Sequence, residues 1–114
     1  MVGLASMAAD YDWNFFIILS GSIDNLRIQT RDRFKKDLKL ISKRGYDLGL
    51  LDAVVEKLAN GVQLEEKYRD HALTGDYVGF RECHILPDWL LIYRIEESEI
   101  ILFLSRTGTH SDLF

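Results

Sequence analysis

Two neighbouring segments of the chain carry apolar residues at helical spacing. They cover residues 30–44 and 47–60. Their inner positions are Phe34, Leu38 and Ile41 in the first and Leu51, Val54, Val55 and Leu58 in the second. Residues three and four apart lie on one side of a helix, so each segment predicts a helix with one buried face. Gly45 is a typical helix stop and Asp47 a typical N-cap. Because the turn between the segments is short, we expect an antiparallel helical hairpin.

Strand patterns lie on both sides of this hairpin. One precedes it and three follow it, at residues 26–29, 78–86, 89–95 and 99–105. Short polar turns separate the last three, which predicts an antiparallel meander. The segment at residues 89–95, "WLLIYRI", is almost continuously apolar, as expected of a central strand that is covered on both faces. The intervening residues 71–76 have the composition of a loop.

The predicted order of elements is therefore β-α-α-β-β-β, an α+β fold class. We expect an antiparallel sheet with the two-helix hairpin packed on one face. The other face can stay open, and the polar residues with chemical potential cluster at the strand ends and loops around it.

The length of 114 residues corresponds to one domain, and the apolar fraction of 47% is sufficient for a two-layer core. The single cysteine, Cys83, excludes an intrachain disulfide and favours a reducing compartment. Residues 1–24 contain the apolar run "WNFFIIL", which is too short to span a membrane, and no basic residue stands before it as in a signal peptide. We therefore expect a cytoplasmic protein without membrane contact. Residues 25–114 would form the domain, and residues 1–24 an extension that is an extra strand, a mis-assigned start or a cloning remnant.

The net charge of −4 hides an uneven distribution. Residues 1–24 contain three acids and no base, whereas residues 26–44 contain eight bases and two acids, a local charge of 8 − 2 = +6. The local basic segment rather than the whole-chain balance governs contact with anionic partners. Its structural alternative is an ordinary solvated helix face.

The three histidines all lie in the C-terminal half, at His71, His84 and His110, and Asp88 stands among them. Histidine is the side chain that most readily moves protons near neutral pH. RNA cleavage needs a base for the 2′-OH proton, an acid for the leaving 5′-oxygen, and cations or hydrogen-bond donors for the charge that develops on phosphate. The histidines, the carboxylate and nearby arginines meet these needs. Each residue also has a structural alternative, such as a hydrogen-bonded strand histidine or a turn aspartate.

Two arginines and two aromatic residues complete the candidate set. Arg81 and Arg106 are candidates for binding phosphate, and Trp89 and Phe114 for stacking on unpaired bases. The alternatives are an ion pair for an arginine, a core position for Trp89 and a pinned terminus for Phe114. A zinc site would use the same histidines, but no compact H-x-H or H-E-x-x-H pairing exists. We expect no metal and no other cofactor.

Together these segments resemble the YafQ-like branch of the RelE/ParE toxin superfamily, the toxins of bacterial type II toxin–antitoxin pairs. The resemblance runs from Leu26 to Phe114 and is densest in "YRDHALTGDYVGFRECHILPDWLLIYRI" and "RTGTHSDLF". The combined pattern is a Y-[KR]-D-H-x-L element, then G-[YF]-R-x-x-H-x-x-P-D-W, then R-T-G-T-H-x-x-L-F. The RelE-like fold of that superfamily has the same β-α-α-β-β-β order.

The resemblance implies a ribosome-dependent endoribonuclease that cleaves mRNA in the ribosomal A site and so inhibits translation. It assigns the acid–base group to His71, His84, Asp88 and His110. It places Trp89 and Phe114 at positions tied to activity, and it directs Arg106, with Arg81 as a weaker candidate, to phosphate. Which histidine is base and which is acid is left open. A weak preference puts Asp88 or His71 near the 2′-OH and His110 near the leaving oxygen.

The resemblance also implies partners. They are a cognate antitoxin, the 70S ribosome with its mRNA, and operator DNA only through the antitoxin complex. Two other functions stay open at this stage: a non-enzymatic binding toxin, such as a ParE-like gyrase inhibitor, and an inactive toxin on the same scaffold. The near-neutral charge of the remainder, with 14 bases and 15 acids, is lower than expected of a protein that binds ribosomal RNA. Codon preference, the antitoxin's identity and the oligomeric state are not encoded in any recognisable pattern.

Overall fold

A five-stranded sheet forms the centre of the computed structural model, which describes residues 26–114. The strands, in the spatial order β1-β5-β4-β3-β2, are β1 (Arg27–Thr30), β5 (Ile101–Gly108), β4 (Trp89–Glu96), β3 (Arg81–Leu86) and β2 (His71–Ala72). The helices are α3 (Asp32–Lys43), α4 (Leu48–Ala59) and α5 (His110–Leu113), with short 3-10 turns at Glu66–Tyr68 and Gly75–Tyr77. The α+β class and the order of the main elements are confirmed. The prediction about residues 1–24 lies outside the described residues.

The sheet is mixed rather than wholly antiparallel. Strands β3, β4 and β5 form the predicted antiparallel meander. Strand β1, however, pairs with β5 in parallel, from Arg27 opposite Ile101 to Thr30 opposite Leu104. A short turn fixes the direction only of strands that it joins directly. Because two helices and three other strands separate β1 from β5 along the chain, no turn determined how they would pair.

The two long helices bury their apolar stripes against one face of the sheet. Phe34, Leu38 and Ile41 of α3 join the core, as do Leu51 and Val55 of α4. The predicted cap is present, because the Asp47 carboxylate accepts a hydrogen bond from the backbone N–H of Gly49 at 2.9 Å. Gly45 ends the first helix with φ of 85°, a conformation that glycine adopts without strain. This face holds the main hydrophobic core of the described residues.

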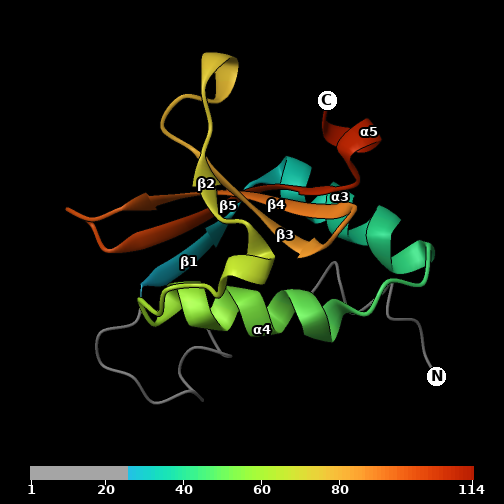
Figure 1. Ribbon diagram of the computed structural model, residues 1–114, viewed down its shortest axis with the longest axis horizontal. Coiled ribbons are helices and arrows are strands. Elements are labelled where there is room, and N and C mark those ends of the chain that lie inside the picture. Colours follow the sequence, from blue (N-terminus) through green and yellow to red (C-terminus); the bar gives the residue numbers. More distant parts are fainter. Residues whose placement is uncertain (1–25) are drawn as a thin grey trace.

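The opposite face carries a smaller cover, which the sequence did not predict. Leu90 and Ile92 of β4 are buried there with Leu113 of α5, and Leu73, Tyr77 and Phe80 pack around them. Figure 1 shows α4 running along one side of the sheet, whereas the segment after β2 and the C-terminal α5 lie on the other. The expected open face is therefore partly closed by two short segments. Residues 71–72, expected as loop, form the edge strand β2.

Within residues 26–114, no helix is long and apolar enough to cross a membrane.

Candidate active site

The register of the sheet gathers the histidine-bearing segments on one face. Across neighbouring strands, His71 lies opposite Glu82, Glu82 opposite Ile92, and Ile92 opposite Arg106. His84 lies opposite Leu90 in the next row. Directly opposite residues in antiparallel strands point to the same side of the sheet. Since Leu90 and Ile92 belong to the small cluster on the face away from α3 and α4, the histidines lie on that face too.

Glu82 connects two of the three histidines. Its Oε1 atom lies 3.5 Å from Nε2 of His71 and 3.8 Å from Nε2 of His84, and the two rings are 6.5 Å apart. The Glu82 side chain is only 10% exposed, whereas the side chain of His71 is 49% exposed and that of His84 22% exposed. Sequence reasoning missed this carboxylate. The available signal was its position two residues before His84 on a predicted strand, which puts both side chains on one face.

Backbone carbonyls hold the other nitrogen of each ring. Nδ1 of His71 lies 2.6 Å from the carbonyl oxygen of Arg69, and Nδ1 of His84 lies 3.2 Å from that of Pro87. A carbonyl oxygen can only accept, so Nδ1 is the donor in both rings and the neutral rings keep a lone pair on Nε2. Arg69 adopts a left-handed conformation with φ of 48°, which is uncommon for a residue other than glycine. The two rings therefore present their proton-accepting atoms on the side of Glu82.

Asp88 and His110 meet at the other end of the site. The Asp88 carboxylate accepts a hydrogen bond from the backbone N–H of His110 at 3.2 Å, so it holds the start of α5 rather than the imidazole. The His110 ring lies 5.2 Å from that of Phe114, which in turn lies 5.7 Å from Tyr77. Phe114 is 55% exposed. These contacts place an exposed histidine and an exposed aromatic ring side by side on the short C-terminal helix.

The position of α5 depends on Asp112. Its carboxylate accepts two hydrogen bonds from the Arg44 guanidinium, at 2.7 and 3.1 Å, and forms a capping box with Thr109. The Arg44 hydrogen bond is the main reason that the pKa of Asp112 lies well below its usual range. Gly108 allows this packing, because a Cβ there would lie 3.1 Å from the Asp112 side chain. The turn after α3 thus anchors the helix that bears His110.

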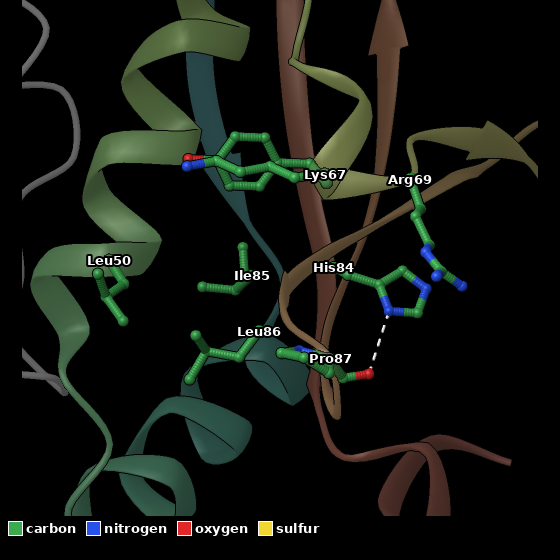
Figure 2. Close-up of a pocket in the computed structure, with 8 residues that line it drawn as sticks. Leu50, Lys67, Arg69, His84, Ile85, Leu86 and Pro87 are labelled. Carbon is green, nitrogen blue, oxygen red and sulfur yellow. Dashed lines mark hydrogen bonds between the residues drawn. The ribbon is translucent and has the colours of Figure 1, made fainter.

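A pocket of about 580 Å³ opens beside His84 at the edge of the sheet. Leu50, Ile85 and Leu86 form an apolar wall, and Lys67, Arg69 and His84 a polar one. Figure 2 shows the His84 ring turned away from Leu50, toward Arg69 and the Pro87 carbonyl. The pocket therefore leaves the partly buried His84 ring accessible from solvent.

The two candidate arginines are both engaged in ion pairs. Arg106 donates to the Asp37 carboxylate of α3 at 2.7 and 3.2 Å, and the backbone N–H of Thr107 donates to the same group at 3.1 Å. Arg81 donates to Asp70 at 3.3 Å from two of its nitrogens. Arg81 lies opposite Tyr93, a residue of the main core, so its position belongs to the helix-covered face.

These pairs change what the arginines can do. Asp70 also accepts a hydrogen bond from the Tyr93 hydroxyl at 2.6 Å, and burial, followed by this bond, raises the pKa of Tyr93. Arg81 is therefore part of a supporting network on the helix-covered face, and its contact with phosphate stays a prediction. Arg106 is on the predicted face, but its charge is balanced by Asp37. Its contact with phosphate stays a prediction.

The prediction that Trp89 stacks on RNA bases is wrong. Its side chain is 0% exposed and packs edge-on against Tyr46 at 5.1 Å in the main core. Its indole N–H donates to the Thr107 hydroxyl at 2.9 Å, and that hydroxyl donates to the Leu90 carbonyl. Trp89 is the first residue of β4 and directly follows Asp88, which lies in the turn between β3 and β4. The burial of Trp89 therefore fixes this turn and the Asp88 carboxylate, which holds the start of α5.

A sequence profile described as "Bacterial toxin of type II toxin-antitoxin system, YafQ" matches residues 26–114. The chain belongs to this family. The mRNA interferase toxin YafQ of Escherichia coli K12 is 39% identical over 88 residues, which cover 76% of this chain and 94% of that protein.

Solved structures of YafQ-like proteins have the same fold. A metal-bound toxin from Helicobacter pylori is 52% identical, with a TM-score of 0.74, over 78% of this chain and 99% of that one. The E. coli YafQ subunit of a DinJ-YafQ complex is 38% identical, with a TM-score of 0.72, over 78% of this chain and 98% of that one. Within residues 26–114 of this chain, no group of three or more His, Cys, Asp or Glu side chains is arranged so that it could hold a metal ion.

Proposed function

We propose that this toxin is a ribosome-dependent endoribonuclease that cleaves mRNA in the A site, with His71, His84 and His110 as its acid–base group and Asp88 as the residue that positions His110. The observation that carries the proposal is that the Nε2 atoms of His71 and His84 both lie near the Glu82 carboxylate. The Nδ1 atom of each ring is hydrogen-bonded to a backbone carbonyl. The name of the E. coli relative, mRNA interferase toxin, supports the substrate. A toxin that acted only by binding would not need two rings prepared in this way.

The first step is proton abstraction by His71 or His84. The Nε2 lone pair of one ring takes the proton of the ribose 2′-OH, and the 2′-oxygen attacks the adjacent phosphorus. The ring becomes an imidazolium with N–H groups on both sides. The Nδ1 proton stays on the carbonyl, and the new Nε2 proton faces the Glu82 carboxylate, which stabilises the positive charge.

The second proton movement is assigned to His110. As the bond from phosphorus to the 5′-oxygen breaks, the protonated His110 ring donates a proton to that oxygen. The products are a 2′,3′-cyclic phosphate on one fragment and a 5′-hydroxyl on the other, so atoms and charges balance. Asp88 acts by holding the backbone of His110, and Phe114 places the RNA beside it.

The remaining surface fits the other predicted partners. The outer side of α3 presents a set of exposed cations, which are Arg33, Lys35, Lys36, Lys39 and Lys43. We assign these cations to ribosomal RNA, whose phosphates attract such a surface. The DinJ-YafQ toxin-antitoxin complex of E. coli supports a cognate antitoxin as the regulatory partner. We propose in addition that operator DNA is bound through that antitoxin. Action on ribosome-bound mRNA would take place in the cytoplasm.

The test is mRNA cleavage by the full chain, mapped by primer extension, with and without 70S ribosomes. We expect cuts in register with codons only when ribosomes are present. His110→Gln should lower the cleavage rate by about 10²–10⁴-fold, the usual contribution of a general acid. Ser111→Ala, at the next exposed position of α5, is the matched control and should cut normally.

Two outcomes would contradict the proposal. Equal cutting of naked mRNA would remove the ribosome dependence, and undiminished cutting by His110→Gln would remove the acid. Growth arrest by the toxin without any mRNA cleavage would favour a binding toxin instead.

A further inference from the structure

Planar side chains continue beyond Phe114 across the face that carries the histidines. Phe114 lies 5.7 Å from Tyr77, and Tyr77 lies 6.1 Å from Phe80, ring centre to ring centre. Both contacts are edge-to-face, so the rings are held in fixed orientations. Tyr77 and Phe80 are only partly buried, although they lie against the small cluster around Leu90. The result is a series of rings that begins beside the proposed acid.

Two guanidinium groups extend this series to a further ring. Arg94 lies 5.9 Å from the centre of Phe80 and 4.5 Å from that of Phe103. Arg31 lies 6.0 Å from each of the same two rings. Each of these two guanidinium groups therefore lies within 6.0 Å of both Phe80 and Phe103. We refer to Tyr77, Phe80, Arg94, Phe103 and Arg31 as the aromatic–arginine strip.

The register shows where the strip runs. Phe103 lies opposite Arg94, and Ile92 lies opposite Arg106 on the same face, one step closer to the histidines. One extra residue in β5, Ser105, bulges between these two rows, because Tyr93 pairs with Leu104. The strip thus leads from the proposed active site along β4 and β5, on the face opposite the two long helices. It ends near Arg31, where α3 begins.

The chemistry of the strip suits unpaired RNA. Bases stack on aromatic rings and on arginine planes, and arginine also binds the phosphates between them. Aromatic and arginine side chains also occur in protein interfaces, but this strip begins beside the proposed acid, where the substrate RNA has to lie. Glu96 accepts a hydrogen bond from Arg94 at 3.0 Å and lowers the net charge at that point, but it leaves the planar face of the guanidinium for stacking.

We propose that the aromatic–arginine strip is the binding site for the unpaired nucleotides of the mRNA that flank the cleaved bond. This inference rests on the proposed nuclease function, because it names the path of the same substrate. Phe114 holds the nucleotide at the cleaved bond. Phe103, with Arg31 and Arg94, holds the base and phosphate of a nucleotide farther along the strand. The stacking function that the sequence assigned to Trp89 thus belongs to residues on the opposite face.

The experiment measures binding of the full-length toxin to 70S ribosomes in a His110→Gln background, so that the mRNA stays intact. One set of ribosomes carries mRNA that fills the A site, and the other carries mRNA that ends at the P-site codon. Phe103→Leu keeps an apolar side chain but removes the ring. It should weaken binding to the filled ribosomes by about tenfold, within the usual range for one stacked base, and leave binding to the others unchanged.

Arg31→Gln is the second variant, since Arg31 is exposed and makes no capping hydrogen bond to α3, so the fold does not depend on it. It should show the same dependence on mRNA in the A site. Lys36→Gln, an exposed cation of α3 outside the strip, is the control for loss of one charge and should weaken both complexes equally.

Three results would overturn the proposal. Equal weakening of both complexes by Phe103→Leu would assign the strip to ribosomal RNA. If both strip variants bound ribosomes as well as the unsubstituted protein does, the strip would have no role in RNA binding. If these variants also bound the antitoxin more weakly, the strip would be assigned to the antitoxin. These results are separate from the nuclease proposal. If the unsubstituted toxin bound mRNA through the strip but did not cleave it, the nuclease proposal would be wrong and the strip would still be an RNA-binding site.

Discussion

The two faces of the sheet are built from alternate residues of the same strands, yet they differ in almost every property. On the helix-covered face, Trp89, Leu91 and Tyr93 of β4 are fully or almost fully buried within a large apolar core. On the other face, and among residues 26–114, Leu90 and Ile92 of the same strand form a small cluster with α5 and the segment after β2. The histidines, Glu82 and the aromatic–arginine strip all belong to this second face.

The difference shows how a small toxin separates stability from chemistry. Buried charge is costly unless it is paired, so polar residues with exposed working atoms need a face that is incompletely covered. The helix-covered face supplies the apolar burial that holds the sheet together. On the other face, α5 packs through Leu113 against Leu90 and Ile92, and this contact positions His110 and Phe114. Substitutions on the two faces should therefore affect different measurements.

Trp89→Ala should have the largest effect on stability. It removes a fully buried ring and the hydrogen bond to Thr107, and such truncations cost about 3–5 kcal/mol. Urea unfolding of the two proteins measures the difference. Phe114→Ala, the matched aromatic truncation on the exposed face, should change the free energy of unfolding by less than about 1 kcal/mol and yet reduce mRNA cleavage. A Trp89→Ala protein as stable as the unsubstituted one would contradict this core role.

Asp37→Asn should have the second largest effect. It removes the charge that pairs with Arg106, and both side chains are largely buried, at 11% and 15% exposed. An unpaired buried guanidinium costs about 3 kcal/mol or more. The double variant Asp37→Asn with Arg106→Met should recover part of this loss, because no charge is then left unpaired. If the double variant is no more stable than Asp37→Asn alone, the pair does not act in this way.

The ion pair between Arg44 and Asp112 should make the anchoring of α5 sensitive to acid. The pKa of Asp112 is held below its usual range, chiefly by the Arg44 hydrogen bond, so the folded state binds this proton more weakly than the unfolded chain. Its contribution to stability is therefore present above the ordinary aspartate range, near pH 4, and is lost as the pH falls through the lower folded-state value.

The measurement compares urea midpoints of the unsubstituted protein and Asp112→Asn between pH 7 and pH 2. The unsubstituted protein should be the more stable at pH 7, and the gap should narrow in acid. A gap that is constant with pH would mean that the charge of Asp112 contributes nothing. Because the pair is exposed, 0.5 M salt should also reduce the gap.

Ile100→Asn should have the smallest effect, and in the opposite direction. Ile100 is exposed and has φ of 57°, a conformation that a β-branched residue adopts only with strain. Asparagine tolerates it, so the substitution should stabilise the protein by about 0.5–1 kcal/mol and leave mRNA cleavage unchanged. A loss of stability would indicate that the exposed side chain is packed in solution.

The local patterns of the sequence predicted most of the elements. Helical spacing identified α3 and α4, and apolar strand segments separated by short turns identified the meander β3–β4–β5. These features depend on residues a few positions apart, so the sequence contains them directly. The two-residue strand β2 escaped this reasoning, because His71 and Ala72 form a strand only through pairing with Glu82 and Arg81.

The candidate site was predictable only in part. The three histidines, Asp88 and Phe114 followed from residue type and motif, and all lie on or beside one face; their catalytic roles stay predictions. Glu82 was missed because its one signal, the i, i+2 spacing to His84, is weak until the register brings His71 next to it. Trp89 was misassigned because a tryptophan at a strand start has the same pattern whether its ring is buried or exposed.

By itself, therefore, the sequence determined the two helices, the antiparallel meander and the family, and it supplied the candidate acid–base residues, whose roles stay predictions. The tertiary structure alone decided the parallel pairing of β1 with β5, the face on which each ring lies, and the partners of the charged groups. The reason is distance along the chain. Asp37 and Arg106 are 69 residues apart, and Arg44 and Asp112 are 68 apart, so only the packing of α3 beside β5 and α5 brings them into contact.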